Sequence, residues 1–180
     1  MGLIVRRLER TDDRTQFRSG NLDLHRFFQR YAGQNQFRHH LGTTYIAVDD
    51  ARIAGFVTVA PSQIDSKQLP AAGAERRAPY PLPVLRLARL AVDEREQGRG
   101  VGLALLRFVF VLAHRMADDY GCAGIVVDAK ADAVAFYKRY GFVSFEVAEG
   151  LLGDRPRPTP MFLELGAIPR VDASVEELPE

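Results

Sequence analysis

One segment limits the possible folds of this chain more than any other: an apolar strand that runs into a glycine-rich turn and then into a long helix. Residues 84–92 are rich in Val and Leu and predict a buried strand. Glycines follow at Gly98, Gly100 and Gly102, and apolar residues recur at helical spacing through residues 99–119. The chain is therefore expected to fold as a layered α/β or mixed α+β structure in which a helix begins just after a buried strand.

The same segment predicts a site for a phosphate or pyrophosphate. Glycines let the backbone approach an anion closely, and the first turn of a helix offers free N–H groups and a favourable dipole. A Walker A loop would need Gly-Lys-Ser/Thr after the glycines, but Leu103 follows Gly102. A dinucleotide fingerprint would need another glycine spacing and a strand near the start of the chain. A glycine-rich turn that binds nothing stays the alternative.

The remaining pattern predicts a sheet with helices on its faces. Residues 3–8 predict a first strand, and Asn21 can cap a helix whose apolar stripe is Leu22, Leu24, Phe27, Phe28 and Tyr31. Residues 43–48 and 53–60 predict a hairpin, and residues 61–83, which hold five prolines, a long loop. The later elements are expected to be a strand at 123–128, a helix at 132–140 that Gly141 ends, and strands at 142–147 and 160–165.

Size and composition fit one domain without disulfides. A chain of 180 residues suits a single core, which we place at residues 1–166, followed by an acidic tail at 167–180 that we expect to be mobile. Cys122 is the only cysteine, so neither a disulfide within the chain nor a cysteine-based metal cluster is expected. The sequence has no segment like a signal peptide and no apolar run of the roughly 20 residues that span a bilayer. We expect a cytoplasmic protein with no membrane partner and no metal.

Two motifs at the right separation resemble those of the GNAT N-acetyltransferases. Gln97, Gly100 and Gly102 match the pyrophosphate arm of that family, Gln/Arg-x-x-Gly-x-Gly/Ala. The second motif is a strand at 126–128, the run Ala-Val-Ala-Phe-Tyr at 133–137, and Tyr-Gly-Phe at 140–142. The resemblance implies the GNAT fold, with a mostly antiparallel mixed sheet of about six or seven strands and helices on both faces. It also implies acetyl-CoA as the co-substrate.

The resemblance assigns expected roles to the residues of both motifs. Tyr137 would protonate the departing thiolate, whereas without the motif it would be taken for a half-buried core tyrosine. Asp132 would either bond the pantetheine or cap the helix that follows it. One backbone N–H of the strand would polarise the acyl carbonyl. The residues expected to contact the cofactor are Leu90, Ala91, Val92, Gln97, Gly98, Arg99, Gly100, Val101, Gly102, Asp132 and Phe136.

The carboxylate that many GNAT enzymes use as a general base is missing from its usual strand. Residues 84–92 contain Arg86 and Arg89 but no acid. Either the base lies elsewhere or the acceptor amine needs little help to lose its proton. The α-amine of an aminoacyl ester is much less basic than the amine of lysine, whose pKa is about 10.4.

A narrower resemblance covers roughly residues 20–147 and points to the GNAT toxins of bacterial toxin–antitoxin pairs. It rests on residues 21–28, 31–36, 43–48 and 54–59, and on Arg89 to Asp93. Members of that group acetylate the amino acid on charged tRNA, block translation, and are silenced by a ribbon–helix–helix antitoxin. The resemblance therefore implies charged tRNA and such an antitoxin as partners.

The distribution of charge gives modest support for a tRNA partner. Residues 1–40 carry eight Arg and four acids, and residues 67–89 carry five basic residues and one acid. Arg76, Arg77 and Arg89 could hold tRNA phosphates, although such clusters are often ordinary solvated surfaces. A GNAT enzyme for a small-molecule or protein amine, and a CoA-binding module without turnover, are the other hypotheses. The oligomeric state stays open, a homodimer included.

Overall fold

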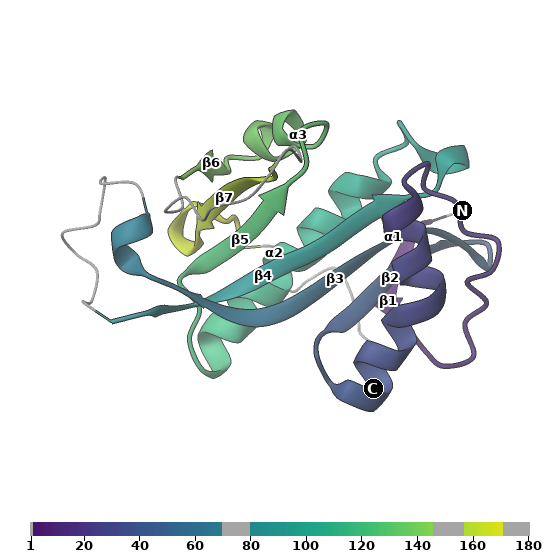
Figure 1. The fold of residues 1–180 in the computed structure, drawn as a ribbon, viewed down its shortest axis with the longest axis horizontal. Coiled ribbons are helices and arrows are strands. Elements are labelled where there is room, and N and C mark those ends of the chain that lie inside the picture. Colours follow the sequence, from purple (N-terminus) through teal and green to yellow (C-terminus); the bar gives the residue numbers. More distant parts are fainter. Residues whose placement is uncertain (1, 70–79, 146–156, 171–180) are drawn as a thin grey trace.

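A mixed sheet forms the centre of the computed structural model, which describes residues 2–69, 80–145 and 157–170. Its seven strands lie in the order β1-β2-β3-β4-β5-β7-β6 (Figure 1). Strands β4 and β5 are parallel, and all the other neighbouring pairs are antiparallel. The predicted mixed and mostly antiparallel sheet is confirmed. The strands are β1 Ile4–Arg7, β2 Thr43–Asp49, β3 Arg52–Ile64, β4 Leu82–Val92, β5 Gly124–Ala129, β6 Val143–Ser144 and β7 Thr159–Glu164.

Helices cover both faces of the sheet. Helix α1, Leu22–Arg26, begins at Asn21, whose side-chain oxygen accepts hydrogen bonds from the amides of Asp23 and Leu24, as the sequence predicts. It continues through two π-helical segments, Phe27–Tyr31 and Gln34–His39. Helix α2, Val101–Asp119, lies on the opposite face, and the short helix α3, Val134–Arg139, follows β5 (Figure 1). Gly141, at φ 94°, follows the end of α3, as predicted.

Two apolar layers hold these helices against the sheet. On one face Leu105, Leu106 and Val109 of α2 pack with Leu87 and Val127. On the other face Phe27 and Phe28 pack with Phe17, Ile46 and Phe56, and the rings of Phe28 and Phe56 stack with centroids 4.4 Å apart. The sheet therefore separates an α2 side from an α1 side.

The predicted apolar stripe of the first helix is only partly right. Phe27 and Phe28 are buried, but Leu22 is 68% exposed and Tyr31 is 48% exposed. A π-helical turn holds more residues than an α-helical turn, so a spacing counted at 3.6 residues per turn misplaces Tyr31 at the end of the first π-helical segment. Leu22 is exposed at the first position of α1.

The second π-helical segment was not predicted, because its sequence is polar. Its buried residue Gln36 explains why it packs there. The Gln36 amide donates to the Leu8 carbonyl at 3.1 Å and accepts from the Thr44 N–H at 2.8 Å. One side chain thus satisfies two backbone groups that the strand ends leave unpaired.

The predicted loop at 61–83 is shorter than expected at both ends. Strand β3 continues through Pro61 to Ile64, which pairs with Leu82 at the start of β4. Strand β2 ends its pairing opposite Val59, so β3 has a free edge at Pro61 that tolerates a residue without an N–H. A 3₁₀ turn, Ser66–Gln68, follows Asp65, whose side chain caps it. Residues 70–79, part of the predicted strand at 142–147, and the acidic tail from 171 lie outside the described residues.

None of the helices in the described segments is long and apolar enough to cross a bilayer.

A buried carboxylate ties the segment before α1 to the end of β4. The Asp93 side chain has no solvent exposure and accepts hydrogen bonds from the Arg18 amide at 3.1 Å and from the Arg95 guanidinium at 2.9 and 3.0 Å. Burial alone would raise the pKa of Asp93, but the hydrogen bonds from Arg95 and Arg18 outweigh it and hold the pKa at about 2. The carboxylate is therefore charged at neutral pH.

This pKa predicts how acid destabilises the fold. A carboxyl whose pKa falls from 3.8 to about 2 on folding stabilises the protein above the unfolded pKa and loses that contribution as the pH drops toward 2. Asp93→Asn should lower the free energy of unfolding at pH 7 by about 2 kcal/mol and flatten its dependence between about pH 5 and pH 2. Urea unfolding at several pH values measures both effects. Asp118→Asn, which removes an exposed carboxylate, is the control; equal acid sensitivity in the wild type and Asp93→Asn would contradict the prediction.

Candidate active site

Strands β4 and β5 pair for only three residues and then separate. The last pair is Leu87 with Val127. Directly after it, β4 carries a β-bulge: Leu87 lies opposite Val59 and Arg89 opposite Thr58, so Ala88 is the extra residue. A bulge bends its strand. The main chain from Ala88 to Val92 consequently has no pairing with β5 in the part of the chain that the structure describes.

A groove of about 490 Å³ opens where these strands separate. Its lining joins several segments that are distant in the sequence: the end of β4, the start of α2, the end of β5 and the start of α3. Most of the predicted site residues line it, namely Arg89, Leu90, Ala91, Val92, Gln97, Gly102, Asp132, Phe136 and Tyr137.

Other predicted site residues lie beside the groove or outside the description. Gly98, Arg99 and Gly100 form the exposed turn just before α2, and Val101 is buried at the first position of that helix. Arg76 and Arg77 lie outside the described residues.

Some groove residues were not predicted. Ser19, Asn21 and Leu24 come from the segment around the start of α1, and only the capping of Asn21 had a local signal. Asp128 belongs to the second motif but had no role assigned to it, and Lys130, between the parts of that motif, was not singled out.

The glycine turn is open to solvent and held in a fixed shape. Gly98 and Gly100 adopt φ values of 77° and 82°, and a Cβ added at either would meet no atom within 4 Å. Gly100 is the N-cap of α2, and the first amides of a helix have no acceptor within the helix. The turn therefore presents free N–H groups to a space that nothing else in the described chain fills.

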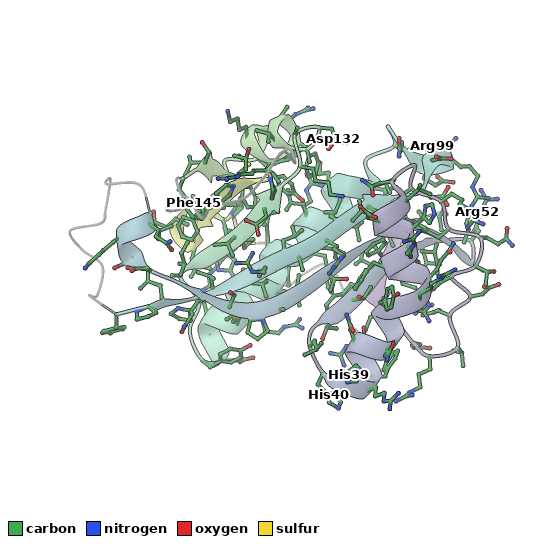
Figure 2. All side chains as sticks on the ribbon, in the orientation of Figure 1. His39, His40, Arg52, Arg99, Asp132 and Phe145 are labelled. Atoms are coloured by element: carbon green, nitrogen blue, oxygen red, sulfur yellow. The ribbon has the colours of Figure 1, made fainter. Side chains whose placement is uncertain are left out.

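Two side chains next to the glycines hold the turn in place through hydrogen bonds and ion pairs. The Gln97 amide donates to the carbonyls of Ser19 and Val92, both at 3.3 Å. The buried Glu96 pairs with Arg52 at 3.5 Å and with Arg99 at 3.3 Å, and Figure 2 shows both arginines at this end of the molecule. The Gln97 side chain thus stabilises the turn, while its backbone stays part of the open turn.

Tyr137 is a buried phenol at the edge of the groove. It is 4% exposed, and its ring packs edge to face against Phe136 and Phe142 with centroid distances of 5.2 Å. Burial raises the pKa of Tyr137 well above its ordinary value, so the phenol is protonated at neutral pH. The side chain can donate a proton from a fixed position.

Asp132 is exposed beside α3 and lines the groove (Figure 2). The N-cap of α3 is Ala133, and no side-chain hydrogen bond caps this helix. The capping role considered for Asp132 therefore has no support in the geometry.

The groove passes through the sheet from one face to the other. Gly102, Phe136 and Tyr137 line it from the α2 side, where Leu90 and Val92 also pack. Asn21 and Arg89 line it from the α1 side, where the Arg89 guanidinium lies 3.8 Å from the ring centre of Phe27. Partial burial lowers the pKa of Arg89, and an arginine side chain in a protein stays protonated. Residues from both faces of the sheet, with a cation on the α1 side, therefore line one groove.

Comparison with known proteins relates this geometry to toxins. The tRNA-acetylating toxin of Mycobacterium tuberculosis (strain ATCC 25618 / H37Rv) is 36% identical over 138 residues, which cover 76% of this chain and 82% of that protein. The structure of AtaT complexed with acetyl-methionyl-tRNAfMet is similar, with a TM-score of 0.81 and 23% identity over 93% of this chain and 97% of that one.

A further similar structure is a Tyr-to-Phe variant of AtaT bound to acetyl-CoA and to the C-terminus of the antitoxin AtaR. Its TM-score is 0.72, with 23% identity over 92% of this chain and 95% of that one. At this identity both AtaT structures establish the shared fold. The sequence profile of the acetyltransferase (GNAT) domain matches residues 40–144. The chain therefore belongs to the GNAT acetyltransferase family.

Proposed function

We propose that this protein transfers the acetyl group of acetyl-CoA to the α-amine of an aminoacyl-tRNA, and that it acts in the cytoplasm as the toxin of a toxin–antitoxin pair. The observation that carries the proposal is the groove through the sheet, with the glycine turn and Tyr137 on its α2 side and Arg89 on its α1 side. The 36% identity to a tRNA-acetylating toxin supports the choice of acceptor.

The groove fits an acyl-CoA on two structural grounds. The turn at Gly98 and Gly100 leaves room for a pyrophosphate, which the amides of Gln97 to Gly102 would bind. The unpaired main chain of Leu90 to Val92 can pair with the amides of a pantetheine as a neighbouring strand would. Acetyl-CoA would supply an acetyl group activated as a thioester.

The residues of the chain would position the acetyl group and supply one proton to the leaving sulfur. A backbone N–H of the unpaired part of β4 would donate to the acetyl carbonyl oxygen and stabilise the negative charge that grows there. The Tyr137 hydroxyl would give its proton to the sulfur as the C–S bond breaks. Its surrounding phenylalanine rings keep it neutral and ready to donate.

Replacing Gly100 tests the pyrophosphate site. Gly100→Val should place a side chain in the open space before α2 and weaken acetyl-CoA binding by about tenfold or more. Calorimetry measures the affinity. Gly121→Val is the matched control, because it carries the same kind of strain, at φ 114°, beyond the other end of α2. Unchanged affinity in a folded Gly100→Val protein would remove the turn from the site.

Replacing Tyr137 tests the proton donor. Tyr137→Phe should keep acetyl-CoA affinity and reduce turnover by about 10²–10⁴-fold, because only the hydroxyl is lost. Single-turnover kinetics measure the chemical step directly. Tyr140→Phe is the control, since Tyr140 lies at the end of the same helix and does not line the groove. A rate within about twofold of wild type would exclude Tyr137 as the acid.

Labelled acetyl-CoA identifies the acceptor. Incubation with charged tRNA and with a panel of small amines and peptides should label the charged tRNA. Binding of that tRNA should weaken with salt, with a log–log slope of about −0.7 to −0.9 per phosphate contact. Arg89→Glu should weaken tRNA binding and leave acetyl-CoA affinity nearly unchanged, whereas Arg107→Glu on α2 should change neither.

The same proposal makes a prediction in cells. Expression without an antitoxin should arrest growth, and Tyr137→Phe should relieve the arrest. Normal growth at high levels of active enzyme, together with label on a small amine only, would favour the small-amine hypothesis.

A further inference from the structure

A carboxylate stands at the point where β4 and β5 separate. Asp128 is the first residue of β5 after the last pair, Leu87 with Val127. Its Oδ2 accepts a hydrogen bond from Arg86 Nη1 at 2.8 Å. The Asp128 side chain is 53% exposed, and no hydrogen bond to its Oδ1 is found among the residues that the structure describes. One carboxylate oxygen is thus fixed and the other is free to bind a ligand.

Asp128 and Arg86 face away from α2. Ile125 and Val127 pack against the α2 layer, and successive side chains of a strand point to opposite faces. Val126, the partner of Arg86 in the ladder, packs with Val84 and Phe162 on the other face. The carboxylate therefore lies on the face of the sheet from which Arg89 lines the groove, opposite the face that carries Tyr137.

Two hollows meet at Asp128. It lines the groove that carries Tyr137, and it also lines a second hollow of about 280 Å³ between Arg86, Gln68 and Phe145. Phe145, which lies close to β6 (Figure 2), also lines this second hollow. The carboxylate therefore lies where the linings of the two hollows meet.

We propose that Asp128 binds the acceptor amine and takes its proton during acetyl transfer. This inference rests on the proposed function in that it requires an amine acceptor at this groove. As the new C–N bond forms, the nitrogen becomes cationic, and Asp128 Oδ1 stabilises that charge and accepts one proton. As the C–S bond breaks, the sulfur receives the Tyr137 proton, and exchange with water then restores both side chains.

The inference accounts for the missing acid on β4. Residues 84–92 hold no carboxylate, but Arg86 of that strand orients one that β5 supplies. Arg86 is therefore a positioning residue, and Asp128 is the group that touches the substrate. The acid comes from the neighbouring strand because β4 and β5 part just beyond Leu87 and Val127.

Asp128→Asn tests the inference, with Asp118→Asn as the matched control. Asp118 also pairs with an arginine, Arg170 at 3.1 Å, and is 58% exposed, but it lies at the far end of α2. With CoA present, the affinities for an aminoacyl-tRNA and for its N-acetylated form are measured for each variant. The two ligands differ by one acetyl group, which turns a basic amine into an amide that carries no positive charge, and the Asp118→Asn control shows how much of the preference depends on the carboxylate.

Asp128→Asn should lower the preference for the free amine by about tenfold and kcat/KM for the acceptor by about 10²-fold. Its acetyl-CoA affinity should stay within about twofold of wild type, and Asp118→Asn should behave as wild type. Asp128→Glu, which keeps the charge, should recover part of the rate. An unchanged preference together with an unchanged kcat/KM would overturn the inference, as would a loss confined to acetyl-CoA affinity.

If the proposed function is wrong, the labelling experiment gives a different result. If wild type labels another amine and no charged tRNA, the acceptor assignment is wrong. The three variants are then assayed with that amine and its N-acetyl product. The same loss in Asp128→Asn would uphold the role of Asp128, and its absence would overturn it.

Discussion

The separation of β4 from β5 is the constraint on which the functional part of this structure depends. Three residue pairs hold the strands together, and the extra residue Ala88 then bends β4 away. Backbone N–H and C=O groups inside a protein need partners. The stretch from Ala88 to Val92 has no pairing with β5, so a groove opens beside it and its backbone groups on that side have no partner strand. A ligand with amides along its length can form these hydrogen bonds.

The two sides of the groove are built as one unit. Asp93 and Glu94 bond to the backbone of Arg18, and Gln97 bonds to Ser19, just before the helix that covers the α1 side. The glycine turn and the start of α1 therefore cannot shift independently. A bound anion at the turn would stabilise the same contacts that fix Asn21 and Leu24 at the acceptor side of the groove.

The sequence predicted those features that local backbone chemistry decides. The strand before Gly98, the helix after Gly100, and the turn at Gly141 follow from residue types at fixed spacing. The π-helical segments, the buried Gln36 and the extension of β3 past Pro61 depend on tertiary contacts that no spacing encodes. Asp128 was visible in the second motif, but its partner Arg86 is 42 residues away and was recognised only from the register of β4 and β5.

A groove that passes through a sheet also decides how its two ligands come and go. Residues of both faces line the groove, so under the proposed function the donor would bind on the α2 side and the acceptor on the α1 side. Both ligands would then be bound at once and react directly, without a stage in which the protein itself carries the acyl group. An acceptor carried by a molecule as large as a folded nucleic acid would then never have to pass the nucleotide end of the donor.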